Sequence, residues 1–345
     1  MGYSPTRREL MRSMAAVGVT VACPGVAAAQ TRSRNTVATA RGLVRGTEAD
    51  GVHVFKGMRY GADTTLRRFL PPRPPEPWTG VFDATSYGDQ APQTPNAIAG
   101  DEPMSEDCLR INVWTPASDA KRRPVMLWFH GGGFEVGAGS SALYDGTNLA
   151  KRGDVVVATI NSRLNVFGFC DLSRKLGDEY RSSGNAGVMD LAMAMRWVRE
   201  NISAFGGDPT NITIFGQSGG GRKVSMCYAS PLAAGAFQRG IVQSGSHLMV
   251  HTPEKADALV GLLLGELGLG EGDAVEALEG PASDVRVRKQ CREVASRRGF
   301  HVIRDVRRRV DDRRHRRLRG VGLRGLGGGG GLGGGGGGGG AGLDP

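Results

Sequence analysis

Ser218 is the residue of this sequence best suited to act as a nucleophile. It lies in Gly216-Gln217-Ser218-Gly219-Gly220, which matches the pattern G-x-S-x-G. Residues 211–216 before it are β-branched and aromatic and predict a buried strand, and residues 219–229 after it have helical spacing. Such a turn strains and exposes the serine, and its glycines let strand and helix approach closely. With 55 glycines in the chain the pattern also arises by chance, but its position between a strand and a helix favours a nucleophile over a plain turn.

A second stretch that could do chemistry is His130-Gly131-Gly132-Gly133-Phe134, which directly follows the apolar run VMLWF. Glycines at the end of a strand leave backbone N–H groups bare, and such donors stabilise the negative charge of an oxyanion. The N–H group of Gly219 would add a further donor. A plain turn and a phosphate cradle are the alternatives; the cradle is disfavoured because no G-K-[ST] follows.

The elements that must position these residues alternate along the chain. Apolar runs predict strands at 109–114, 125–129, 155–160 and 240–243, and residues 186–205 predict a helix with one apolar stripe. Residues 206–209 (GGDP) predict the turn that ends this helix, residues 36–61 predict a hairpin around residues 48–51, and the proline-rich residues 67–78 predict an extended surface segment. Strands that alternate with helices indicate an α/β fold with a mainly parallel sheet.

The charge and the cysteines exclude some function classes for most of the chain. The net charge is +10, but residues 1–285 hold 28 of the 44 basic and 29 of the 34 acidic residues, a net charge of −1. The excess basic charge therefore belongs to residues 286–345 and does not indicate a nucleic-acid partner for the rest. The five cysteines have no metal-ligand spacing and favour small buried residues over a zinc or redox site.

Residues 1–29 predict an export signal. Arg7-Arg8 precede a mildly apolar run that ends in Ala27-Ala28-Ala29, which offers a cleavage site before Gln30. The arginine pair favours a twin-arginine signal over an ordinary secretory signal, and the run is too short for a membrane anchor. We expect a periplasmic or secreted protein.

Several stretches together resemble the carboxylesterase type B family, the α/β-hydrolase branch that includes cholinesterases and para-nitrobenzyl esterases. They are FKGMRYG, RFLPPRPPEPWTGVFDATSYGDQAPQ, SEDCLRINVWTP, PVMLWFHGGGFEVGAGSS and GNAGVMDLAMAMRWVRENISAFGGDPTNITIFGQSGGG, with VQSGS beyond. The resemblance covers about residues 36–246. It implies an α/β-hydrolase fold, Ser218 as nucleophile, and Gly132, Gly133 and Gly219 as oxyanion donors. It also implies that Glu106 pairs with Arg68 in a structural role.

The sequence departs from the family pattern at two positions near these motifs. Ala91 stands where the family usually has a cysteine bridged to the one matching Cys108, so we expect Cys108 to be a free buried thiol. Gln217 replaces the glutamate common before the family serine, which argues against a choline-type substrate.

The acid and histidine of the expected triad are not identifiable in the sequence. In this fold both follow the serine at a distance. His130 belongs to the glycine segment, His247 and His251 follow Ser218 too closely, and His301 and His315 lie in a stretch of unusual composition. We therefore interpret residues 30–285 as a partial α/β-hydrolase domain.

Residues 286–345 are rich in arginine and then in glycine, with 17 glycines among residues 320–345. This composition predicts a disordered tail. A change of reading frame in GC-rich coding sequence is one interpretation, and a basic arm for nucleic acid is another, disfavoured because no aromatic residue follows Phe300.

The sequence thus predicts a serine hydrolase that acts on small carboxylic esters, without cofactor, metal or membrane anchor. A catalytically inactive esterase-like protein is the alternative. Nothing in the sequence indicates the oligomeric state.

Overall fold

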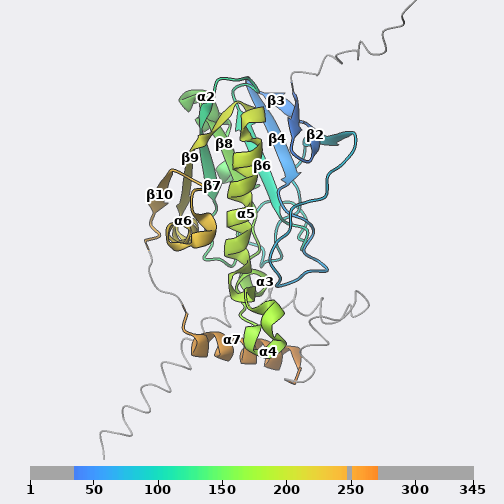
Figure 1. The fold of residues 1–345 in the computed structure, drawn as a ribbon, viewed down its shortest axis with the longest axis vertical. Coiled ribbons are helices and arrows are strands. Elements are labelled where there is room, and N and C mark those ends of the chain that lie inside the picture. Colours follow the sequence, from blue (N-terminus) through green and yellow to red (C-terminus); the bar gives the residue numbers. More distant parts are fainter. Residues whose placement is uncertain (1–34, 247–250, 271–345) are drawn as a thin grey trace, which may run out of the picture.

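The computed structural model describes residues 35–246 and 251–270, which form a central sheet with helices on both faces (Figure 1). The main sheet has seven strands in the order β10-β9-β7-β8-β6-β4-β3, and a smaller sheet has the order β1-β2-β5. The strands are β1 (Thr36–Thr39), β2 (Gly42–Arg45), β3 (Thr47–Ala49), β4 (Val52–Arg59), β5 (Val81–Asp83), β6 (Arg110–Thr115), β7 (Arg123–Phe129), β8 (Val156–Ile160), β9 (Gly207–Gln217) and β10 (Arg239–Gln243).

Four adjacent strands of the main sheet, β10, β9, β7 and β8, are paired in parallel, and β6, β4 and β3 join them antiparallel. The predicted α/β fold with a mainly parallel sheet is confirmed. In the register of β7 against β9, Phe129 lies opposite Gly216. Both strands end at the same edge of the sheet, so the segments that follow them, His130–Gly133 and Ser218–Gly219, meet there.

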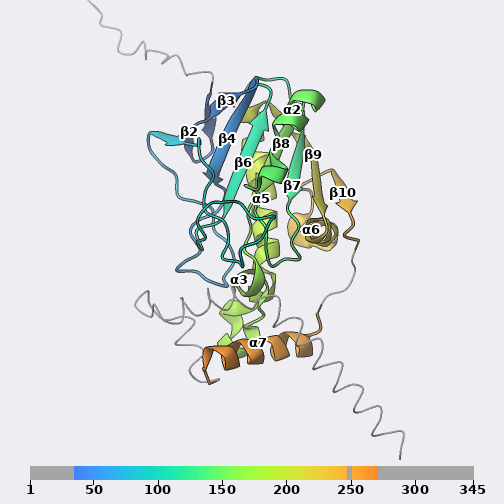
Figure 2. The ribbon, with the colours of Figure 1, turned by 180° about the vertical axis from the view of Figure 1, so that it is seen from behind.

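Alternating side chains of the strands build a core on each face of the sheet. In β8, Val156, Ala158 and Ile160 pack into the larger core, whereas Val157 packs into a second cluster with Val155. Helices α5 (Ala186–Asn201) and α6 (Gly219–Ala229) cover the first face, and the short helix α2 (Thr147–Gly153) covers the other (Figures 1 and 2). Since both faces are covered, the central strand β8 is buried along its whole length, as is usual in parallel sheets.

A third cluster lies beyond the end of the sheet. It joins α3 (Asn165–Phe169) to α7 (Pro253–Leu267), which runs across the bottom of the molecule in Figure 1. Helix α4 (Ser173–Leu176) contacts α7 through the ion pair of Arg174 and Asp257. Val260, Leu263 and Leu264 of α7 are buried against Phe69 and Phe167. The short 3-10 helices are η1 (Ala142–Tyr144), η2 (Asp178–Tyr180), η3 (Ser183–Asn185), η4 (Ile202–Phe205) and η5 (Pro231–Ala233).

Most predicted elements are present, with one difference before the serine. Gly206 ends the helical segment in a left-handed conformation (φ 77°), as predicted. Strand β9, however, begins at Gly207 rather than at residue 211, so residues 207–209 are not part of a turn. The reason is tertiary pairing: Arg123 of β7 lies opposite Gly207, and its N–H group donates to the carbonyl oxygen of Gly206 (2.8 Å).

The predicted hairpin is confirmed, because β3 and β4 pair antiparallel around Asp50 and Gly51, both with positive φ. Within the described ranges, no helix is both long and apolar enough to cross a membrane. The predicted export signal (1–29) and basic tail (286–345) lie outside the described residues.

Candidate active site

Ser218 occupies the turn between β9 and α6. Its backbone has φ 56° and ψ −118°, a conformation that costs a non-glycine residue about 1–3 kcal/mol. The Ser218 N–H group donates to the carbonyl oxygen of Gln243 at the end of β10 (2.8 Å). The strained backbone that the sequence predicts at this serine is therefore present and is fixed by its neighbours.

Glycines allow the serine turn to pack closely against the end of β7. A methyl group on Gly216 would lie 2.5 Å from the carbonyl carbon of Gly220, and one on Gly220 would lie 2.0 Å from the carbonyl oxygen of Phe129. A methyl group on Gly131 would lie 3.7 Å from Cβ of Ser218. The predicted reason for glycine on either side of the serine is confirmed, and the same packing brings the glycine segment beside Ser218.

The glycine segment after β7 has a backbone that other residues adopt only with strain. Gly132 and Gly133 have φ values of 88° and 65°, and a methyl group on Gly132 would lie 2.0 Å from the carbonyl oxygen of Val136. The carbonyl oxygen of Gly132 accepts hydrogen bonds from the N–H groups of Glu135 (3.0 Å) and Val136 (3.1 Å). The chain thus reverses tightly around these two glycines.

The structure brings together the three predicted oxyanion donors. A methyl group on Gly219 would lie 2.5 Å from the backbone nitrogen of Gly133, so the two backbones are in contact. Within residues 35–246 and 251–270, the N–H groups of Gly132, Gly133 and Gly219 donate to no protein acceptor. Unpaired donors of this kind, gathered beside a serine, can stabilise an oxyanion.

His130 is buried behind this segment and is engaged through both ring nitrogens. Its Nδ1 lies 2.9 Å from the carbonyl oxygen of Gly131, and its Nε2 lies 3.5 Å from Nζ of Lys223. Burial and then the charge of Lys223 lower the pKa of His130 well below its usual value. His130 is thus held as a neutral ring away from Ser218, in agreement with its exclusion as the base.

Lys223 of α6 is a residue that the sequence analysis did not single out. Its side chain is buried, and burial lowers its pKa to about 7, with Cys227 acting in the opposite direction. One sequence signal could have found it. Gly220, Lys223, Val224 and Cys227 follow the three- and four-residue spacing of a buried helix face, so Lys223 occupies a core position.

Among the described residues, no side chain is positioned to act as the general base for Ser218. Within them, no side chain forms a hydrogen bond with the Ser218 hydroxyl. His53 lies on β4, where its Nδ1 is 3.3 Å from the Ser118 hydroxyl. Of the histidines that the sequence analysis set aside, His247, His301 and His315 lie outside the described residues, and His251 lies just before α7.

Glu135 adds an acidic group next to the glycine segment. Its side chain is half-buried, and in the described part of the chain its Oε2 atom has no hydrogen-bond partner. Burial raises its pKa to about 7. Near neutral pH both the protonated and the ionised form of this carboxyl group are therefore populated.

Two buried ion pairs hold the segments around the site. Arg68 binds Glu106 through Nε (2.7 Å) and Nη2 (2.5 Å), which confirms the pairing that the resemblance implies. Arg163, after β8, binds Asp190 of α5 and also donates to the carbonyl oxygen of Leu70 (2.8 Å). Both pairs are structural, because their donors and acceptors are used within the protein.

The cysteine prediction also agrees with the structure. Cys108 is a free, fully buried thiol, and burial raises its pKa far above the usual range. Ala91 is buried as well.

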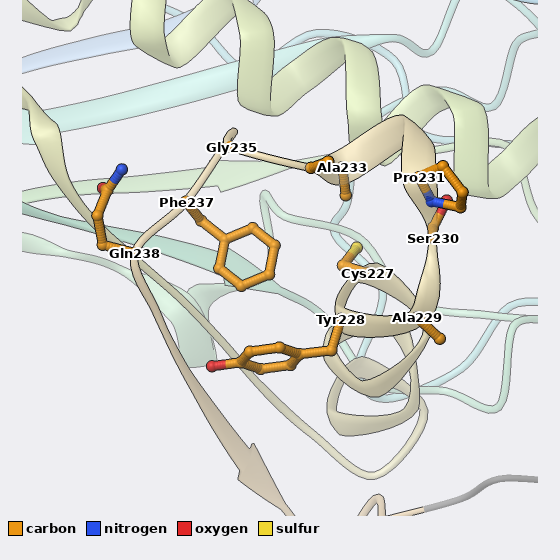
Figure 3. A pocket seen from close by; sticks show the side chains of 10 residues that line it. Cys227, Tyr228, Ala229, Ser230, Pro231, Ala233, Gly235, Phe237 and Gln238 are labelled. Carbon is orange, nitrogen blue, oxygen red and sulfur yellow. The ribbon is translucent and has the colours of Figure 1, made fainter.

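One surface hollow lies apart from these residues. It has a volume of about 440 Å³ and is lined by residues 227–231, 233–235, 237 and 238 at the far end of α6 (Figure 3). The rings of Tyr228 and Phe237 meet edge to face there, with their centroids 5.0 Å apart. Neither Ser218 nor the glycine segment lines it, so we do not assign the chemistry to this hollow.

Comparison with known proteins identifies the family. The profile of the carboxylesterase family matches residues 33–269. The chain belongs to this family. It is 46% identical over 241 residues to a para-nitrobenzyl esterase of Bacillus subtilis, and 39% identical over 249 residues to a phenmedipham hydrolase of Pseudarthrobacter oxydans. These matches cover 68% and 70% of this chain and 48% of each relative, so the chain spans about half the length of these curated relatives.

Solved structures confirm the α/β-hydrolase fold of this carboxylesterase-family chain. A carboxylesterase of Geobacillus stearothermophilus superposes with a TM-score of 0.69 at 43% identity, covering 79% of this chain and 57% of the other. A para-nitrobenzyl esterase superposes with a TM-score of 0.67 at 44% identity, covering 75% and 53%.

Proposed function

We propose that this chain carries the nucleophile and the oxyanion hole of a carboxylic ester hydrolase. The observation that supports the proposal is the close contact between the strained Ser218 turn, at Gly219, and the glycine segment, at Gly133. The N–H groups of Gly132, Gly133 and Gly219 have no acceptor among the described residues. Family membership supports the same reaction class.

In the proposed reaction, Ser218 Oγ forms a bond to the ester carbonyl carbon and loses its proton to a base. The carbonyl π electrons move to the oxygen, and the three N–H groups bind the resulting oxyanion. Collapse of this intermediate re-forms the carbonyl, breaks the bond to the alcohol and leaves an acyl-enzyme, which water hydrolyses to the acid. The residues we assign use no metal or cofactor.

The base and acid of the triad are not among the residues we assign. Loss of the triad costs about 10⁶-fold in turnover, and the oxyanion hole with binding retains about 10³–10⁴-fold over water. We therefore propose that the chain alone turns over esters slowly. The substrate would be a small neutral ester, because Gln217 places an uncharged side chain beside the serine.

Covalent labelling of Ser218 tests this proposal with little dependence on turnover. The full chain is incubated with a fluorophosphonate, which transfers its phosphonyl group to an activated serine and loses fluoride, and peptide mass spectrometry locates the adduct. We expect labelling at Ser218, none in Ser218→Ala, and slow release of nitrophenolate from para-nitrophenyl acetate that the same variant lacks. A folded chain labelled no faster at Ser218 than at surface serines would instead indicate the inactive alternative.

We further propose that the protein is exported as a folded chain. The support is the arginine pair Arg7-Arg8 before an apolar run with an Ala27-Ala28-Ala29 cleavage site. Changing both arginines to lysine should retain the protein in the cytoplasm in cell fractionation. Export of that variant at the wild-type level would contradict a twin-arginine signal.

A further inference from the structure

Lys223 carries a buried amine whose two hydrogen-bond contacts both lead to His130, at the start of the oxyanion segment. Its side chain is 1% exposed. Its Nζ lies 3.3 Å from the carbonyl oxygen of His130 and 3.5 Å from Nε2 of the same residue. Among the described residues no acidic side chain pairs with it. A buried ammonium group without a carboxylate is costly, so its presence at this position requires an explanation.

The hydrogen bonds around His130 fix the state of its ring. A carbonyl oxygen only accepts, so the 2.9 Å contact between Nδ1 and the Gly131 oxygen requires a proton on Nδ1. Since the pKa of His130 is lowered, the ring is neutral and Nε2 carries the lone pair. Lys223 is then the donor to Nε2, and it stabilises this tautomer over the other.

The same hydrogen bonds determine the direction of an oxyanion donor. The carbonyl group of Gly131 and the N–H group of Gly132 are opposite ends of one planar trans peptide group. When His130 holds the oxygen at one end, the N–H at the other end is oriented as well. The next peptide group is held in the same manner, because the Gly132 oxygen accepts from Glu135 and Val136 and so orients the N–H of Gly133.

We propose that Lys223 is a positioning residue of the esterase site, which through His130 holds the Gly131–Gly132 peptide group with its N–H directed at the oxyanion. This inference rests on the proposed function for its catalytic consequence. Lys223 also connects the two parts of the site, because it belongs to the helix that begins after Ser218 and binds the segment that carries Gly132 and Gly133.

Lys223 is not placed to act as the missing base. Among the described residues, both hydrogen-bond contacts of its Nζ are to His130, and none is to the serine.

The protonation state of Lys223 should affect how firmly the Gly132 N–H group is oriented near neutral pH. The titratable groups that face it are His130, from the glycine segment, and Cys227, on its own helix. His130 stays neutral, and burial raises the pKa of Cys227 to about 12, so Lys223 is the group of this cluster that titrates near pH 7. The charged form donates more strongly to His130 than the neutral amine.

The test compares Lys223→Met with the matched control Arg222→Met. Arg222 is the adjacent residue, and its side chain is exposed. The full chain carries each change, and the rate of fluorophosphonate labelling at Ser218 is measured against pH and reagent concentration, which separates the reaction step from reagent binding. In parallel, ¹⁵N spectra of histidine-labelled protein report which ring nitrogen of His130 carries the proton, with His130→Gln for assignment.

We expect Lys223→Met to label about 10–100-fold more slowly at saturating reagent, a loss typical of a misaligned donor. Reagent affinity should be unchanged and Arg222→Met should match the wild type. Labelling of the wild type should fall as the pH rises through about 7, and this fall should be smaller in Lys223→Met, in which only the nearby Glu135 still titrates in that range. His130 should carry its proton on Nδ1 in the wild type and shift toward the Nε2 form in the variant.

Three results would overturn the inference. One is equal labelling of Lys223→Met and Arg222→Met. Another is a wild-type His130 with its proton on Nε2, which is read without any variant. The third is a loss in Lys223→Met as complete as in Ser218→Ala, which would assign Lys223 as the base. If the wild type is not labelled at all, the proposed function fails, while the tautomer of His130 still decides whether Lys223 holds the segment.

Discussion

Replacing Gly220 by alanine should separate Ser218 from its oxyanion donors. The added methyl group would lie 2.0 Å from the carbonyl oxygen of Phe129 and 3.0 Å from that of His130, whereas ordinary van der Waals contact begins at 3.4 Å. Both neighbours are backbone atoms of β7 and the glycine segment, so no side chain can rotate away. Relief requires α6 and the end of β7 to separate by about 1 Å, and overpacking of this kind costs about 1–3 kcal/mol.

The expected result for Gly220→Ala is a loss of both stability and reactivity. At about 2–4 °C per kcal/mol for a protein of this size, a cost of about 1–3 kcal/mol should lower the melting temperature by about 2–12 °C. A displacement of 1 Å between nucleophile and donors should slow labelling of Ser218 by about 100-fold. Differential scanning calorimetry and the fluorophosphonate assay measure the two effects.

A matched control makes the same chemical change where there is room for it. Gly261 lies within α7, is exposed, and a methyl group there would meet no atom within 4 Å. Gly261→Ala should raise stability by about 0.5–1 kcal/mol through helix propensity and leave labelling unchanged. If Gly220→Ala behaves like Gly261→Ala, the close contact between the serine turn and β7 does not hold the site together, and our reading of these glycines is refuted.

Two further predictions concern buried charges. The pKa of Lys223 is lowered to about 7, so between about pH 7 and pH 10 the unfolded chain holds a proton that the folded chain has released, and stability should rise with pH across this window. In urea unfolding, the free energy of unfolding should increase between pH 7 and pH 9.5 by about 3 kcal/mol more in the wild type than in Lys223→Met. An equal increase in both proteins would show that the pKa of Lys223 is not lowered. For the buried pair of Arg68 and Glu106, Arg68→Met should cost about 3–5 kcal/mol because it removes the ion-pair partner of a buried carboxylate, and adding Glu106→Leu should recover most of that loss. A single-variant cost below about 1 kcal/mol in urea unfolding would show that the pair is not needed.

The serine turn and the glycine segment were predictable because local sequence determines them. Glycine spacing around Ser218 and after Phe129 reflects backbone positions where a Cβ atom clashes or φ is positive, and these requirements act within a few residues. Arg68 and Glu106 are distant in sequence, so no local pattern predicts their pairing. The prediction came from the family resemblance alone.

Other features depend on contacts that the local sequence does not contain. Asp208 and Pro209 are residue types typical of a turn, yet they lie within β9, in an irregular stretch between Gly207 and Ile212, which both pair with β7. Lysine is a residue type expected at the surface, yet Lys223 is buried because α6 lies over the end of β7. The buried pair of Arg163 and Asp190 likewise became evident only from the packing of α5.

The pairing of β7 with β9 has a consequence for how the site forms during folding. Phe129 and Gly216 are neighbours in the sheet, although β8, α5 and several shorter helices lie between them in the sequence. Contacts between residues so far apart in sequence form slowly, because the chain loses conformational entropy on closing the loop before the contact stabilises it. On the ribosome, the serine turn and the glycine segment can meet only after β9 has emerged, long after β6, β7 and β8. The site is therefore among the last parts of the sheet to form, and labelling of Ser218 during refolding would time the completion of the sheet.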